Sequence, residues 1–178
     1  MSVQALPESL KIVAFSVGAA IAYGLIHDQI TAHICVEYFS IAHPPIFPTS
    51  SPFLLALGWG VIATWWTGLL LGLGLAVAAR IGPGPRLGLA QVKKPIAWLM
   101  AVAAICAAVS GVLGAAYAAN APDMLLADWN TVIPEEKLIA FFAVGWAHAA
   151  SYAAGTLGGA FLMLWAIWRR FRPARAVA

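Results

Sequence analysis

The chain has 178 residues, of which 62% are hydrophobic and only 10% are charged, and its mean hydropathy is +0.87. A soluble domain carries about 25% charged residues and could not bury this much apolar surface in one core, so the composition excludes a soluble protein and predicts an integral membrane protein. The net charge of +3 does not indicate a nucleic-acid partner, because the basic residues lie at the ends of apolar segments.

The first apolar segment covers about residues 9–27. Its N-terminal flank is only weakly basic, so we expect an uncleaved membrane helix rather than a signal peptide. Residues 28–39 contain neither Gly nor Pro, and the first strong helix breakers are Pro44 and Pro45. We therefore expect this helix to continue to residue 39 and to extend beyond the lipid.

Three further apolar segments follow, and each has the roughly 20 residues that a bilayer core requires. The second covers about residues 53–79 and follows a Ser-Pro pair, which favours the start of a helix. The third covers about residues 95–119, and the fourth covers about residues 135–169. The predicted fold is an all-α integral membrane protein, in which residues 1–178 form one bundle of four transmembrane helices.

Charged residues are distributed unequally between the two ends of these segments. Nine of the ten Lys and Arg residues lie at one end, and six of the seven Asp and Glu residues lie at the other. By the positive-inside rule, both chain termini and the loop between the second and third segments are expected in the cytoplasm, and the membrane is expected to be a bacterial cytoplasmic membrane. The residues predicted inside are Lys11, Arg80, Arg86, Lys93, Lys94, Arg169, Arg170, Arg172 and Arg175, and those predicted outside are Asp28, Glu37, Asp123, Asp128, Glu135 and Glu136.

Two histidines on different helices are predicted to lie at the same depth. At about 1.5 Å per residue, a helix places His27 roughly 24 Å from Lys11, and it places His148 roughly 26 Å from Trp165. Both histidines therefore come close to the outer boundary of a hydrocarbon core about 30 Å thick. The first and fourth helices are expected to extend together beyond the lipid on this side.

The first helix carries the densest group of candidate metal ligands. His27 and Asp28 lie at its predicted exit from the lipid. His33 and Glu37 follow at i and i+4 spacing, which can place an imidazole and a carboxylate within reach of one ion. Two alternatives remain open: an interfacial pair at the headgroups for His27 and Asp28, and a solvated surface pair for the other two residues.

The fourth helix supplies a second candidate group. His148 lies among Ala, Gly and aromatic residues, where an ionisable side chain is costly unless it has a partner. Tyr152 lies one turn further along and Trp146 lies nearby, so both are candidate cofactor contacts. His43 precedes two prolines and could fold back over the group from its loop. The alternatives are a neutral His148 hydrogen-bonded within the bundle and a His43 with only a loop role.

Imidazole and carboxylate ligands without thiolate favour Zn, Fe, Cu or Mn over iron–sulfur chemistry. A set of two histidines and one carboxylate would also leave coordination positions open for water or oxygen. Haem ranks below a non-haem ion, because paired axial histidines usually lie inside the spans and only His27 and His148 fit such a position. The predicted metal ligands are His27, Asp28, His33, Glu37, His43 and His148.

Three functions are consistent with this sequence. The first is a small membrane protein, redox-active or hydrolytic, with a metal site at the outer face; whether it is an enzyme is left open. The second is a non-catalytic accessory or assembly subunit of a larger membrane complex, because the spans are rich in Trp and no soluble domain is evident. The third is an oligomeric transporter or channel, which is disfavoured because no pair of interrupted helices is apparent. Besides lipid, the expected partners are other membrane subunits or further copies of the chain.

Overall fold

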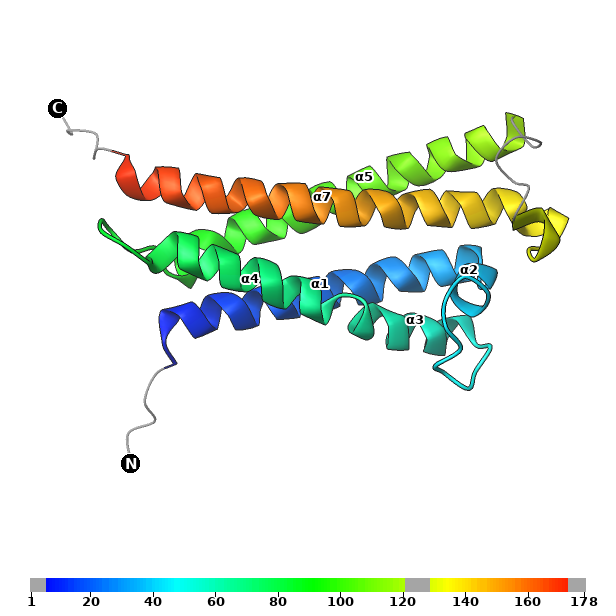
Figure 1. Ribbon diagram of the computed structural model, residues 1–178, viewed down its shortest axis with the longest axis horizontal. Coiled ribbons are helices and arrows are strands. Elements are labelled where there is room, and N and C mark those ends of the chain that lie inside the picture. Colours follow the sequence, from blue (N-terminus) through cyan, green and yellow to red (C-terminus); the bar gives the residue numbers. More distant parts are fainter. Residues whose placement is uncertain (1–5, 121–128, 173–178) are drawn as a thin grey trace.

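The computed structural model describes residues 6–120 and 129–172, and these residues form helices without any strand (Figure 1). The helices are α1 (Glu8–Ile34), α2 (Glu37–Ser40), α3 (Pro52–Ile62), α4 (Trp65–Arg80), α5 (Leu89–Asn120), the 3₁₀ turns η1 (Trp129–Thr131) and η2 (Glu135–Lys137), and α7 (Leu138–Phe171). Four stretches of this described chain are long and apolar enough to cross a membrane, with α3 and α4 together making the second and η2 with α7 the fourth. The prediction of an all-helical protein with four candidate spans is confirmed.

The four stretches are arranged as two pairs of neighbours (Figure 1). In one pair α1 packs against α3 and α4, and in the other α5 packs against α7, while α4 and α7 join the two pairs. Small residues allow the first pair to approach closely: a Cβ added at Gly68 would lie 2.8 Å from the Cα of Val17, and one added at Gly72 would lie 2.8 Å from the Cβ of Ser16.

The second span is interrupted, whereas one continuous helix is predicted over residues 53–79. Helix α3 ends at Ile62, and α4 begins at Trp65. Between them the amide of Thr64 donates to the carbonyl of Val61 at 3.3 Å, and its hydroxyl donates to the carbonyl of Gly60 at 2.5 Å. A threonine that satisfies backbone groups locally in this way competes with the regular helix. Irregular backbone at membrane depth is tolerated where it is buried in protein or lines a cavity, and Thr64 lines the interior pocket described below.

The first helix ends five residues earlier than the predicted residue 39, because α1 stops at Ile34. Cys35 adopts an extended conformation (φ −150°, ψ 97°), and its thiol donates to a carboxylate oxygen of Glu37 at 3.3 Å. The short α2 then turns the chain across the end of the bundle. A straight helix would carry Phe39 into water, whereas the turn leaves this side chain only 2% exposed. Burial of apolar side chains therefore accounts for the break.

The third and fourth helices also differ from the predicted ranges. Helix α5 begins at Leu89, so Pro95 lies inside it and removes one backbone hydrogen bond near its start. A carboxylate oxygen of Glu8, on α1, accepts a hydrogen bond from the amide of Leu89 at 2.9 Å and so caps α5 across the bundle. Helix α7 begins at Leu138, three residues after the predicted start, because the first turn is 3₁₀. Asp123, Asp128 and Arg175, which enter the predicted charge asymmetry, lie outside the described residues.

One basic residue of α7 is buried. Arg170 is 4% exposed, and its guanidinium donates five hydrogen bonds to backbone carbonyls at the end of α4 and in the loop that follows. That loop curls around the guanidinium with the help of Gly82 and Gly84, whose φ angles of 85° and 97° other residues rarely adopt. The five acceptors are the carbonyls of Ala78, Ile81, Gly82, Pro83 and Pro85, at 2.7–3.3 Å.

The break after α1 gives a prediction about Cys35, which is 1% exposed. Burial raises the pKa of its thiol from 9.0 to about 11. At pH 8 the thiolate fraction is then about 100-fold below that of an unperturbed thiol, and the thiolate is the reactive form. We expect a Cys106→Ala variant to react with a water-soluble maleimide about 100-fold more slowly when folded than when unfolded in denaturant. Equal rates in the two states would contradict the buried position of Cys35.

Candidate metal centre

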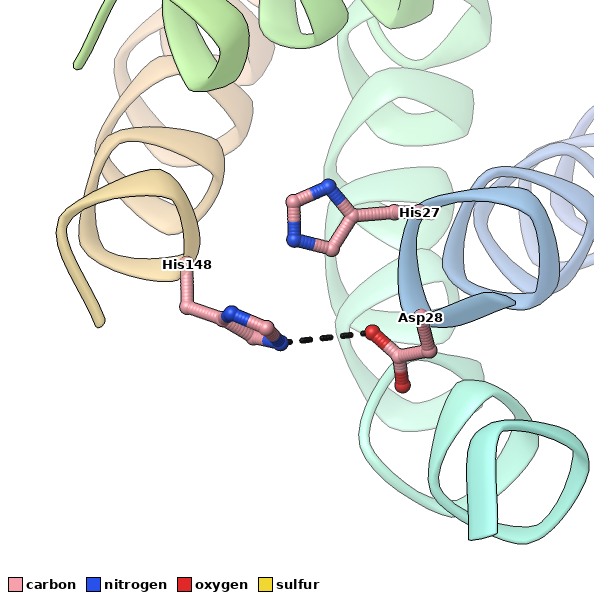
Figure 2. Close-up of side chains that lie close together, drawn as sticks. All are labelled: His27, Asp28 and His148. Atoms are coloured by element: carbon pink, nitrogen blue, oxygen red, sulfur yellow. Dashed lines mark ion pairs between the residues drawn. The ribbon is translucent and has the colours of Figure 1, made fainter. Parts of the chain in front are cut away.

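Three of the predicted ligands come together between α1 and α7. Figure 2 shows His27 and Asp28 extending from α1 toward His148 on α7. One ligand atom from each of the three lies within 4.8 Å of the others. Nε2 of His148 is 3.3 Å from Oδ1 of Asp28, and the rings of the two histidines meet edge to face with centroids 4.6 Å apart. The matched depth of the two histidines, derived from helix lengths, agrees with this meeting.

The group is shielded from solvent. Asp28 is 5% exposed and His148 is 8% exposed. Nε2 of His27 is also buried, and it has no hydrogen-bond partner among the described residues. A buried nitrogen without a hydrogen-bond partner is costly, and a buried carboxylate is costly unless it is paired. A cation between them would compensate both.

The hydrogen bond of Nδ1 of His148 determines whether its Nε2 carries a proton or a lone pair. Nδ1 of His148 lies 2.9 Å from the carbonyl oxygen of Val144. A carbonyl only accepts, so Nδ1 carries a proton, and Nε2 of the neutral ring presents a lone pair. That lone pair faces the carboxylate of Asp28, which also only accepts. A contact of 3.3 Å between these two atoms requires a proton between them, on the ring or on the carboxyl group, or a metal ion beside them. A histidine whose other nitrogen donates to a backbone carbonyl is the usual arrangement for a metal ligand.

Aromatic side chains cover the group from the side of α2. The Tyr38 ring lies 4.6 Å from the ring of His148, and the Phe39 ring lies 5.6 Å from it. His43 belongs to this aromatic layer: its Nδ1 lies 2.8 Å from the carbonyl of Tyr38, and its ring lies 4.6 Å from that of Trp59. The predicted ligand His43 therefore folds back as expected, but it lies outside the group of three.

The structure separates His33 and Glu37 from the centre and from each other. His33 is exposed, and its Nδ1 lies 2.6 Å from the carbonyl of Gln29 in the preceding turn. The carboxylate of Glu37 accepts a hydrogen bond from the Cys35 thiol, and its Oε1 forms an ion pair with Nζ of Lys137 at 3.8 Å. The predicted i and i+4 relation between His33 and Glu37 requires one continuous helix, and α1 ends between them.

The two predicted cofactor contacts lie in different places. Tyr152 lines the interior pocket that also contains the three clustered residues. Trp146 instead packs against α5, where its ring is 5.5 Å from that of Tyr117, and a Cβ added at Gly114 would collide with it at 2.7 Å. The role of Trp146 is therefore to hold α7 against α5.

The pocket beside the group contains polar residues that were not among the predicted site residues. It has a volume of about 130 Å³. The hydroxyl groups of Tyr23 and Ser151 meet there at 2.7 Å, and Oγ1 of Thr67 is buried without a partner among the described residues. Helical spacing carried a signal for two of them, because Tyr23 precedes His27 by four residues and Ser151 follows His148 by three.

Comparison with protein families, with curated proteins and with solved structures found no match. Any assignment of function therefore depends on the chemistry of the chain's own residues. Three features bear on it: the buried pairing of Asp28 with His148, the unpartnered nitrogen of His27, and the pocket that these residues share.

Proposed function

We propose that this protein holds a transition-metal ion at the outer face of the cytoplasmic membrane, with His27, Asp28 and His148 as ligands. The observation that carries the proposal is the buried contact of Asp28 Oδ1 with His148 Nε2 at 3.3 Å, beside the unpartnered Nε2 of His27. Two ligand atoms bound at about 2.1 Å to one tetrahedral ion lie about 3.4 Å apart, which is the spacing of this pair. One ligand atom of His27 lies within 4.8 Å of the ligand atoms of Asp28 and His148.

The ligand types narrow the choice of ion. Two imidazoles and one carboxylate suit Zn, Fe, Cu or Mn, and a ligand set of three leaves at least one coordination position free. When bound, such an ion would supply activation of water or of oxygen, so the expected chemistry is hydrolytic or redox. The aromatic layer of Tyr38 and Phe39 would keep bulk water from the ring of His148 and so strengthen its electrostatic interactions.

The charge distribution supports placing the centre on the outer side. Lys11 lies near the start of α1, and Arg169 with Arg170 ends α7, so the basic ends of both helices are opposite to His27 and His148. By the positive-inside rule those basic ends, and with them both termini, belong in the cytoplasm. The centre would then face the periplasmic side of a bacterial cytoplasmic membrane.

Metal analysis of the detergent-purified protein tests the proposal. We expect a stoichiometric ion in the wild type after exposure to Zn, Fe(II), Cu or Mn. His148→Ala and Asp28→Ala are expected to retain less than about a tenth of it, because losing a direct ligand costs more than the 10–100-fold loss typical of outer-shell changes. His33→Ala is the matched control, since His33 is exposed on the same helix and should retain the ion. Absence of every ion from the wild type would refute the proposal.

A second candidate function, an accessory subunit of a larger complex, is favoured by a groove on the lipid-facing side. This groove has a volume of about 700 Å³ and is lined by apolar side chains of α1, α5 and α7, including Phe15, Ile26 and Val112. It is wide enough to receive apolar side chains of another membrane protein. Native electrophoresis after gentle solubilisation distinguishes the two functions, because an accessory subunit should migrate with partners and a chain migrating at its own mass would exclude them.

A further inference from the structure

The interior pocket extends inward from the candidate metal centre, between the helices. Along α1 its wall runs from Asp28 back to Ser16, which is roughly 18 Å at 1.5 Å per residue. Along α7 it runs from His148 to Leu162, which is roughly 21 Å. The pocket is therefore long and narrow, and one end of it belongs to the centre.

The two ends of the pocket differ in polarity. The end beside the centre is lined by aromatic and polar side chains, including Tyr38, His43 and Tyr152. The far end is lined by leucine and isoleucine side chains: Leu71, Leu75, Ile96, Leu99 and Leu162. Three of these, Leu75, Ile96 and Leu162, also belong to the buried core cluster that joins α1, α4, α5 and α7. The far end is therefore closed by packed side chains, which suits binding rather than passage across the membrane.

Two buried polar atoms on the wall lack partners among the described residues. They are Nε2 of His27, next to the centre, and Oγ1 of Thr67, on the first turn of α4. Nε2 of His27 would be occupied by the proposed metal ion. Oγ1 of Thr67 would be satisfied by a hydroxyl group of a ligand, which can both donate and accept a hydrogen bond.

The pocket has unfilled space next to Gly155. A Cβ added to this residue would meet no atom within 4 Å, although Gly155 lies on a helix packed against two others. It lies seven residues beyond His148, or roughly 10 Å further from the centre. The unfilled volume thus continues past the metal ligands into the apolar half of the pocket.

We propose that this pocket binds a small neutral molecule with an apolar body of at most one ring and a single hydroxyl group, of the phenol class. The hydroxyl is directed at Oγ1 of Thr67, and the ring occupies the space beside Gly155. These two residues lie at one level, because Leu71, one turn after Thr67, packs against Gly159, one turn after Gly155. The volume of about 130 Å³ is close to the roughly 150 Å³ of an engineered apolar cavity that binds benzene. Water alone is poorly suited to the apolar half, because an ordered water needs two to four polar partners. This inference goes beyond the proposed metal site and does not depend on it.

The test uses 4-fluorophenol as the probe, observed by fluorine NMR with the purified, metal-stripped protein in detergent. Competition with unlabelled phenol separates specific binding from partition into micelles. Gly155→Leu fills the open space with a side chain that favours helix, so the fold should be retained. Gly18→Leu is the matched control, because a Cβ at Gly18 also meets no atom, yet this exposed residue does not line the pocket.

We expect the wild type and Gly18→Leu to bind the probe equally and Gly155→Leu to bind it at least about tenfold more weakly, because the leucine side chain takes the space that the ring would occupy. Fluorobenzene, which lacks the hydroxyl, should bind more weakly than 4-fluorophenol to the wild type. Equal binding by the wild type and Gly155→Leu, or no competable binding at all, overturns the inference.

Metal content separates this inference from the proposed function. Gly155→Leu should retain the ion that His148→Ala loses. Metal retained by a wild type that binds no phenol would overturn the pocket inference alone. Competable phenol binding that Gly155→Leu abolishes supports the pocket even in a protein that holds no ion, in which case the metal proposal fails by itself.

Discussion

Replacing Arg170 with Ala is expected to lower the free energy of unfolding by about 3–5 kcal/mol, because several carbonyls lose a charged donor worth about 1.5–3 kcal/mol each while water recovers part of the loss. The side chain is 4% exposed and holds five carbonyls at 2.7–3.3 Å. Its charge also lies at the carboxyl end of α4, where the helix dipole favours a cation. Unfolding in SDS, followed by circular dichroism in mixed micelles, measures the change.

Two variants show whether this effect belongs to the hydrogen bonds. Arg170→Lys keeps the charge but has three donors where the loop offers five acceptors, so it should recover only part of the stability. Arg172→Ala removes a neighbouring charge that rests on the Trp168 ring at 4.7 Å, and it should change stability by less than about 1 kcal/mol. Wild-type stability in Arg170→Ala would show that the buried guanidinium is dispensable.

Replacing Gly24 with Leu is expected to separate α1 from the second span and to lower the free energy of unfolding by about 3 kcal/mol, at the upper end of the cost of overfilling a core. A Cβ at Gly24 would collide with the carbonyl oxygen of Gly60 and with the side chain of Thr64. The obstacle is partly backbone, which cannot rotate away as a side chain can. The same SDS titration reports the loss.

The Gly24 variant should also impair metal binding, because His27 and Asp28 lie on the next turn of the same helix. A tilt of α1 would move both ligands away from His148 and lower the ion content together with the stability. Gly18→Leu, on the same helix but in open space, should alter neither property. If Gly24→Leu kept the stability and ion content of Gly18→Leu, the close contact between α1 and the second span would be contradicted.

The apolar segments and helix lengths were sufficient to predict much of the molecule. Four candidate spans follow from runs of roughly 20 apolar residues, and such runs have few alternatives. The meeting of His27 with His148 could be anticipated because depth along a helix is a simple count of residues. Asp28 could be predicted at the same depth because it directly follows His27 in the chain. The shared depth of the three residues follows from each helix alone. Their contact also requires α1 and α7 to be neighbours.

The features that escaped prediction depend on contacts between distant segments. Residues 28–39 contain no helix breaker, yet α1 ends at Ile34, because burial of Cys35 and Phe39 outweighs the local preference for helix. His33 and Glu37 were assigned to the centre on the assumption of one continuous helix, and the turn removes them from it. The interruption at Thr64 likewise depends on threonine bonding to a nearby carbonyl, which apolar periodicity does not reveal.

The burial of Arg170 is another feature that the sequence does not reveal. By charge alone it is one of several arginines at a membrane boundary, where such residues usually face water or headgroups. Nothing in its immediate sequence distinguishes it from Arg169, whose guanidinium lies 5.3 Å from the Trp165 ring. The difference arises from the loop after α4, whose carbonyls converge on one of the two side chains.

The guanidinium of Arg170 also has a consequence for biosynthesis. The loop between the second and third spans leaves the ribosome before residue 170 is translated, so its carbonyls must wait for a donor that lies 85 to 89 residues further along the chain. The turn between the second and third spans can reach its final shape only after the last helix is in place. A nascent chain truncated before this arginine should therefore expose the turn to proteases that cannot cut it in the finished protein.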